Sequence, residues 1–208
     1  MKAFQLIPAI AEYADFKTYA QEAGLGAEDL ILTNEYIYEP TISALDLGCH
    51  TLFQEKYGMG EPTDVMVDAI LDELRDKDYN RIIAVGGGTI IDIAKVLAVA
   101  SKEDKVDDLY DRMADLHKVH ELVIVPTTCG TGSEVTNISI INRTTKGVKQ
   151  GIVSPAMFAN EAALIPGMLA SLPYGVFATS SIDAMIHAVE SFLSPNACAI
   201  SELFSKSA

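Results

Sequence analysis

Asp183 and His187 are the two side chains in this sequence whose types and spacing most directly suggest chemistry. Residues four apart lie on one face of an α-helix, so this carboxylate and this imidazole can reach the same metal ion. The helix should be buried by its apolar neighbours Ile182, Met185, Ile186 and Val189. Because a catalytic metal usually takes three or four protein ligands, the pair predicts half of a metal site, with other ligands elsewhere.

A second candidate lies in residues 85–92 (VGGGTIID), where an apolar run stops at Gly86, Gly87 and Gly88 and continues as a helix. Glycine lets the backbone approach an anion, and N–H groups at a helix N-terminus point toward it. Thr89 and Asp92 have the spacing of a capping box. The segment is not G-x-G-x-x-G, so by itself it fits a phosphate-binding loop and a tight strand–helix turn equally well.

A third candidate is residues 126–134 (PTTCGTGSE), which also follow an apolar run. Loops at the carboxyl ends of parallel strands bind ligands in open α/β sheets. The hydroxyl groups of Thr127, Thr128 and Thr131 are neutral donors that suit a ribose and a pyrophosphate. A purely structural loop is the alternative, but two such loops after neighbouring strands reinforce the ligand-binding interpretation.

The elements that must position these motifs alternate between strand and helix. Apolar runs predict strands over residues 29–33, 51–57, 81–85 and 121–125, and helical spacing predicts helices over 62–77 and 89–101. Strands without polar alternation, separated by helices, predict a parallel sheet covered on both faces.

Beyond about residue 135 the pattern changes twice. It becomes β-rich through residues 138–141 and 148–153, and it turns helical after Pro173. We therefore expect an α/β domain over residues 1–170, followed by the beginning of a helical domain over 171–208, with the boundary at about 166–174.

The composition excludes several classes of function. The chain has 208 residues, with 29 acidic against 15 basic side chains, which argues against nucleic acid or an anionic membrane as a partner. Its apolar stretches are too short for a membrane span, and no signal-peptide pattern opens the chain. Cys49, Cys129 and Cys198 are odd in number and widely spaced, which favours reduced thiols in the cytoplasm.

Three motifs taken together resemble the iron-containing (group III) alcohol dehydrogenases: residues 86–95 (GGGTIIDIAK), 126–135 (PTTCGTGSEV) and 181–190 (SIDAMIHAVE). Within that family, residues 53–58 (FQEKYG) and 172–177 (LPYGVF) are most similar to the 4-hydroxybutyrate dehydrogenases. The resemblance runs through essentially the whole chain. It implies an N-terminal dinucleotide-binding domain with a Rossmann-like fold and a C-terminal all-helical domain, with the metal and the nicotinamide between them.

The resemblance also implies roles for individual residues. Gly86, Gly87 and Gly88 would take the pyrophosphate, Thr127, Thr128 and Thr131 would contact the cofactor, Asn34 would lie near the adenosine ribose, Lys149 resembles the family's cofactor-contacting lysine, and Asp183 and His187 match its first two metal ligands. The implied cofactors are NAD and Fe(II) or Zn(II). Because Asn34 is neutral, it does not by itself settle NAD against NADP.

The family's remaining metal ligands are two histidines downstream of position 208, while His50, His117 and His120 precede the metal motif and are expected at the surface. We therefore expect a truncated form that binds metal weakly and has little or no dehydrogenase activity. Self-association through an open apolar helix face is also expected, giving a homo-oligomer.

For the intact enzyme, the resemblance implies hydride transfer between NAD and the pair 4-hydroxybutyrate and succinate semialdehyde, which are small-molecule substrates. Another primary alcohol dehydrogenase of the same family is one alternative, and a nucleotide-binding module without catalysis is a second. Glycerol dehydrogenases and dehydroquinate synthases share the general plan, but the loop over residues 126–134 argues against both.

Overall fold

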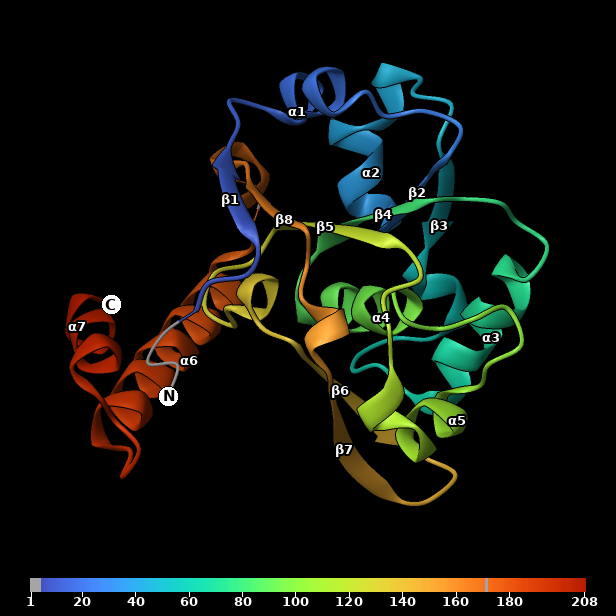
Figure 1. Cartoon of the computed structure of the whole chain (residues 1–208). Coiled ribbons are helices and arrows are strands. Elements are labelled where there is room, and N and C mark those ends of the chain that lie inside the picture. The colour runs from blue at the N-terminus through green and yellow to red at the C-terminus, as the bar shows by residue number, and fades with distance from the viewer. Residues whose placement is uncertain (1–4, 171) are drawn as a thin grey trace.

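A central parallel sheet organises the computed structural model, which describes residues 5–170 and 172–208 (Figure 1). Its strand order is β1-β8-β5-β4-β2-β3, and each neighbouring pair is parallel. The strands are β1 (Ala9–Glu12), β2 (Asp29–Thr33), β3 (His50–Phe53), β4 (Arg81–Gly86), β5 (Glu121–Pro126) and β8 (Glu161–Leu164). The predicted parallel sheet and the strands over 29–33, 81–85 and 121–125 are confirmed.

The strand predicted over residues 51–57 is wrong in its second half. β3 ends at Phe53, and residues Gln54–Tyr57 form a 3₁₀ turn. The Gln54 amide donates to the carbonyl of Gly58 at 2.8 Å, and the Glu55 carboxylate accepts from the backbone N–H of Glu35 at 2.6 Å. These side-chain bonds hold the chain in a turn at the carboxyl edge of the sheet, where the apolar pattern alone predicted a longer strand.

Helices cover both faces of the sheet, as Figure 1 shows. α1 (Phe16–Ala23) and α2 (Glu35–Thr41) lie on one side, while α3 (Asp64–Leu74), α4 (Gly88–Leu97) and α5 (Val106–Asp111) lie on the other. The helices predicted over 62–77 and 89–101 are present but shorter. α3 begins after Thr63, whose hydroxyl accepts from the Met66 backbone N–H at 3.1 Å and caps the helix.

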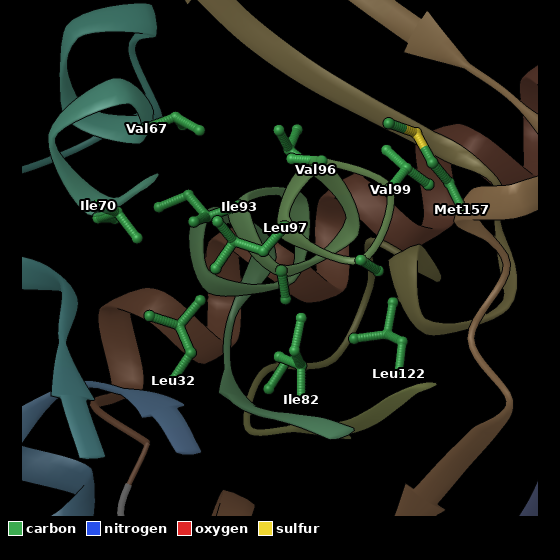
Figure 2. Close-up of a cluster of buried hydrophobic side chains, with 14 of the residues drawn as sticks. Leu32, Val67, Ile70, Ile82, Ile93, Val96, Leu97, Val99, Leu122 and Met157 are labelled. Carbon is green, nitrogen blue, oxygen red and sulfur yellow. The ribbon is translucent and has the colours of Figure 1, made fainter. Parts of the chain in front are cut away.

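The core shows why these strands are apolar throughout. Successive side chains of a strand point to opposite faces, so Ile82 packs under α3 and α4 while Ile83 packs under α1 and α2. Figure 2 shows the first of these layers, in which Leu32, Ile82 and Leu122 come from three strands and meet α4 through Ile93 and Leu97. Because helices cover both faces of the sheet, the side chains on both faces of each central strand are buried, and the strands are apolar without alternating polar residues.

A separate two-stranded sheet lies beside this domain, and it confirms the predicted β-rich region. β6 (Ile138–Arg143) and β7 (Val148–Val153) pair antiparallel. The buried carboxylate of Asp64, at the start of α3, accepts from the backbone N–H and the hydroxyl of both Thr144 and Thr145 in the turn of this hairpin. Burial alone would raise the pKa of Asp64, but these hydrogen bonds outweigh it and hold the pKa well below its ordinary value.

The last two helices are α6 (Tyr174–Leu193) and α7 (Ala199–Ser207), and they project away from the sheet side by side (Figure 1). The expected burial of α6 is wrong. Ile182, Met185, Ile186 and Val189 are between 47% and 59% exposed, and no residue of α6 is buried. α7 and the loop after β5 contact α6, but they leave this apolar face open within the described residues.

α6 begins at Tyr174, inside the interval where the boundary is predicted, and the division into two domains stays a prediction. Among the described residues, no helix is long and apolar enough to cross a membrane.

Candidate functional site

A cavity of about 620 Å³ lies at the carboxyl edge of the sheet, facing the segment that leads into α6. Four neighbouring strands contribute to its wall: Asn34 follows β2, Glu55 follows β3, Gly87 and Gly88 follow β4, and Thr127 and Thr128 follow β5. Leu172, Pro173 and Val176 line it from the other side. The cavity is therefore placed where open α/β sheets bind their ligands, and the two predicted loops meet in it.

The glycine loop gives this cavity a backbone surface. α4 begins at Gly88, and the preceding Gly87 offers no side chain to cap it, so the N–H groups of Gly88 and Thr89 meet no acceptor within the described residues. A Cβ atom on Gly87 would come within 3.2 Å of the Thr128 side chain. Open N–H groups at a helix N-terminus, reached over a surface without side chains, fit a phosphate group.

Gly86 has a different place from the two glycines that follow it. It is buried as the last residue of β4, and a Cβ atom there would come within 2.5 Å of the Ile90 side chain. Gly86 thus permits the tight strand–helix connection, while Gly87 and Gly88 present the surface that faces the cavity.

The capping box predicted from Thr89 and Asp92 is wrong. The helix starts one residue earlier than expected, and the Thr89 hydroxyl donates to the carbonyl of Gly60 at 3.1 Å. The carboxylate of Asp92 accepts from the backbone N–H of Ile140 at 3.0 Å and from the Ser133 hydroxyl at 3.2 Å. Both side chains thus bond to residues far away in the sequence instead of capping the helix.

The second loop connects the cavity with α6. Thr127 is buried and Thr128 packs against Gly87, whereas Thr131 lies near Gly88 without lining the cavity. Gly130 adopts φ +117°, and a Cβ atom there would come within 2.1 Å of the carbonyl oxygen of Ser180. Only glycine lets the loop approach α6 this closely.

Lys95 is a residue whose importance the motif analysis missed. It is fully buried in α4, and its ammonium group donates to the hydroxyls of Ser133 and Thr136 and, at 2.8 Å, to the carbonyl of Ile138. Burial lowers its pKa to about 8, against the opposing effect of the Asp92 carboxylate. The sequence signal that could have identified it is the position of a charged lysine within an apolar helical stretch, where its ammonium group needs buried partners. Its bonds tie the second loop to the helix that follows the glycines.

Asn34 and Lys149, two of the residues expected to contact the cofactor, lie in different surroundings. The Asn34 amide lines the cavity and donates to Glu55 at 2.8 Å and to Gln54 at 3.2 Å. Lys149, on β7, does not line the cavity, and its ammonium group lies 2.7 Å from the carboxylate of Glu61. Asn34 therefore lines the same cavity as the two loops, whereas Lys149 forms an ion pair outside that cavity.

The predicted metal pair lies on one face of α6, with 3.8 Å between the His187 Nδ1 and Asp183 Oδ2 atoms. Both side chains are about half exposed, and neither lines the cavity. Within residues 5–170 and 172–208, no group of three or more His, Cys, Asp or Glu side chains is arranged to hold a metal ion.

The other histidines stand apart from this pair. His117 is exposed as expected, while His50 and His120 are only partly exposed. His120 stacks on the ring of Tyr79 with 4.3 Å between the ring centroids, and burial lowers its pKa. These contacts are packing interactions.

The sequence of the chain matches a known protein family. A profile of the iron-containing alcohol dehydrogenases matches residues 12–166, which is most of the chain. The chain belongs to the iron-containing alcohol dehydrogenase family.

Individual members of this family give the same picture. The chain is 45% identical to 4-hydroxybutyrate dehydrogenase of Clostridium kluyveri over 205 residues, which cover 99% of the chain and 55% of that relative. The crystal structure of sulfoacetaldehyde reductase from Bifidobacterium kashiwanohense in complex with NAD+ is similar in fold, with a TM-score of 0.84, 24% identity, and coverage of 99% of this chain and 57% of that one. An iron-containing alcohol dehydrogenase of Thermotoga maritima has a TM-score of 0.79 at 25% identity, over 99% and 59% of the two chains. The chain spans about half the length of the relatives it matches.

An iron-containing alcohol dehydrogenase binds a metal and a dinucleotide, and the residues of this chain fit these two groups to different degrees. A carboxylate and a neutral imidazole are suitable donors for iron(II) and zinc alike, so Asp183 and His187 fit part of a donor set. The cavity offers open backbone N–H groups, a surface without side chains at Gly87 and Gly88, and the hydroxyls of two threonines. The cavity therefore offers more of the groups that a dinucleotide needs than the Asp183–His187 pair offers of the groups that a metal needs.

Proposed function

We propose that the protein is an NAD-dependent and metal-dependent oxidoreductase that interconverts 4-hydroxybutyrate and succinate semialdehyde. The observation that carries this proposal is the 45% identity to the Clostridium kluyveri enzyme across 99% of the chain. A 4-hydroxybutyrate dehydrogenase of Cupriavidus necator, 35% identical over 141 residues, supports the same substrate pair. Because the matches cover 55% of the Clostridium kluyveri enzyme and 36% of the Cupriavidus necator enzyme, the activity is proposed for the whole protein.

In this proposal the carboxyl edge of the sheet binds and orients the dinucleotide. The pyrophosphate lies against the N-terminus of α4, where the N–H groups of Gly88 and Thr89 have no other acceptor in the described chain. Thr127 and Thr128 donate hydroxyl hydrogen bonds from the second loop. Hydride transfer is the chemistry of the nicotinamide, so the protein's task here is to hold that ring in place.

Asp183 and His187 would hold the metal, which when bound acts as a Lewis acid on the substrate oxygen. Two protein donors are fewer than the usual three or four, so these two side chains by themselves hold an ion weakly. Lys95 and the approach of Gly130 to Ser180 link the cofactor loops to the start of this helix. Through these contacts, cofactor binding and the placement of α6 depend on the same loop.

A nucleotide-binding module without catalysis is the second candidate, and one observation favours it. The dinucleotide cavity is formed by the described residues, whereas the metal pair has no third donor among them. Another primary alcohol dehydrogenase of the family differs from the main proposal only in substrate.

Oxidation of NADH by the whole protein, supplied with iron(II) or zinc, tests these alternatives, whereas the 208-residue chain by itself should show little or no turnover. We expect turnover with succinate semialdehyde, and much slower turnover with butanal, which lacks the carboxylate. Equal rates with the two aldehydes would favour another primary alcohol dehydrogenase, and NADH binding without turnover would favour the module. The variant His187→Ala should lose turnover and keep NADH binding, which separates the metal role from the cofactor role.

A further inference from the structure

We propose that Glu55 makes the cofactor cavity selective for NAD over NADP by excluding a phosphate from the adenosine ribose. This inference rests on the proposed dinucleotide site and goes beyond it by naming the residue that sets the choice. Asn34, the residue expected near the ribose, is neutral and donates its amide hydrogens to Gln54 and Glu55. The carboxylate of Glu55 therefore supplies the charge that Asn34 lacks.

The strand order places Glu55 at the right end of the cavity. The glycines follow β4, Asn34 follows β2 and Glu55 follows β3, and these three strands are neighbours in the order β4-β2-β3. Adjacent strands lie about 4.8 Å apart, so Glu55 is on the order of 10 Å along the edge from Gly87. In sheets of this type the pyrophosphate binds at the helix N-terminus, and an acidic residue farther along the same crevice accepts from the ribose 2′-hydroxyl.

Two hydrogen bonds fix the Glu55 carboxylate and leave it able to accept more. One oxygen accepts from the Asn34 amide at 2.8 Å, and the other accepts from the Glu35 backbone N–H at 2.6 Å. A carboxylate has about four lone-pair positions, so acceptor capacity remains for a ribose hydroxyl. Glu55 also occupies the first N–H group of α2, which a phosphate would otherwise be free to approach.

The surrounding charges favour an unphosphorylated ribose. Among the described residues that line the cavity there is no lysine or arginine. Lys56 and Lys149 lie outside this lining: the Lys56 ammonium is 5.8 Å from the centroid of the Phe53 ring, and the Lys149 ammonium is 2.7 Å from the Glu61 carboxylate. A 2′-phosphate would bring more negative charge to a fixed carboxylate with no lysine or arginine in the cavity lining, which is unfavourable.

The test compares NADH with NADPH, and adenosine 5′-phosphate with adenosine 2′,5′-bisphosphate, by calorimetric titration. The second pair of ligands probes the ribose end without the nicotinamide. The variant Glu55→Gln removes the charge and keeps an oxygen acceptor for Asn34. Glu39→Gln removes the same charge from an exposed position on α2 that does not line the cavity, and it serves as the matched control.

We expect the unmodified chain to bind each unphosphorylated ligand at least about 100-fold more tightly than its 2′-phosphorylated partner. Glu55→Gln should narrow that ratio by about tenfold or more, mainly through tighter binding of the phosphorylated ligand, and Glu39→Gln should leave it unchanged. Added salt should narrow the ratio for the unmodified chain more than for Glu55→Gln, because screening acts on the charge that the variant lacks.

Two results overturn the inference while leaving the dinucleotide site standing: equal affinity of the unmodified chain for NADH and NADPH, or an unchanged ratio in Glu55→Gln. If neither NADH nor adenosine 5′-phosphate binds, the proposed dinucleotide site itself fails, and the selectivity assigned to Glu55 fails with it. Thermal unfolding of both variants shows whether a change in affinity reflects a loss of folding.

Discussion

The sheet region and the α6–α7 pair both have regularly spaced apolar side chains, but these side chains are buried in the sheet and exposed on α6. In β4, Ile82 and Ile83 are fully buried between two helix layers, whereas the apolar side chains of α6 remain about half exposed. The candidate sites differ in the same way. The cavity proposed for the cofactor is built from neighbouring strand ends and backbone N–H groups, while the proposed metal pair has no third donor among the described residues. One sheet edge thus brings the residues of the proposed cofactor site together, whereas α6 by itself provides two donors for the proposed metal site.

The largest expected effect comes from matched truncations in the two regions. Ile82→Ala removes a buried side chain from β4 and should lower the free energy of unfolding by about 4 kcal/mol, through lost burial and a cavity. Ile182→Ala removes a side chain of α6 that is 55% exposed and should lower it by less than about 1 kcal/mol. Urea unfolding of the two variants measures both values.

Equal losses would break the comparison, since they would mean that the α6 face is covered in solution. A concentration-dependent loss in Ile182→Ala would point to cover by a second copy of the chain. Size-exclusion chromatography distinguishes that case, and it also tests the expected homo-oligomer.

Asp64→Asn should have the next largest effect, because Asp64 holds the β6–β7 hairpin to the sheet region. Replacing the carboxylate weakens four hydrogen bonds to a buried charge, and we expect a loss of about 2 kcal/mol near neutral pH. Chemical denaturation measures this loss. The exposed Asp76→Asn, on the turn after α3, is the control and should leave stability unchanged.

The effect of Asp64 should also depend on pH in one direction. Its pKa is lower in the folded chain than in the unfolded chain, so the folded state binds fewer protons in acid and stability rises with pH there. The difference between the unmodified chain and Asp64→Asn should be full above about pH 4 and shrink as the pH falls below it. A difference that stays constant down to about pH 2 would contradict the role given to this carboxylate.

A smaller effect, confined to binding, is expected from Gly87→Ala. The added methyl group would stand 3.2 Å from Thr128 and cover the open end of α4, so NADH affinity should fall by about tenfold while stability changes little. Gly26→Ala is the matched control, because nothing lies within 4 Å of its added Cβ and Gly26 lies outside the cofactor cavity. Fluorescence titration with NADH measures both variants. If Gly87→Ala binds NADH as tightly as Gly26→Ala does, the glycine loop is only a strand–helix turn.

The smallest effect should come from metal. Because Asp183 and His187 are the donors that the described chain brings together, added zinc should raise the unfolding temperature by no more than about 2 °C. His187→Ala should remove that shift, and the exposed His117→Ala should not. Differential scanning fluorimetry with and without zinc measures it. A large shift would show that further donors complete the site.

The outline of the fold could be predicted because it depends on local patterns. Apolar runs such as residues 81–85 identify strands, and glycines after them identify loops, so the sequence predicted which loops meet at the carboxyl edge of the sheet. The prediction failed where side chains turned to distant partners. Asp92 bonds to Ser133 and Ile140 rather than to its own helix, and no local spacing reveals that choice.

The rest of the site depends on such distant contacts. Glu55 reaches Asn34 from 21 positions away, and Lys95 reaches Ile138 from 43 positions away. The burial of α6 was predicted from its apolar face, but a face becomes buried only when another element covers it. The apolar pattern indicated that α6 needs another element to cover it, and no element of the described chain covers this face.

We propose above all that this chain carries a dinucleotide site at the carboxyl edge of its sheet, and that this site binds without a metal at Asp183 and His187. The most direct test is a calorimetric titration of NADH into the purified chain in the presence of a metal chelator. We predict saturable binding of one NADH per chain, retained in His187→Ala and weakened in Gly87→Ala. An absence of saturable binding, or binding that is lost in His187→Ala and indifferent to Gly87→Ala, would contradict the account.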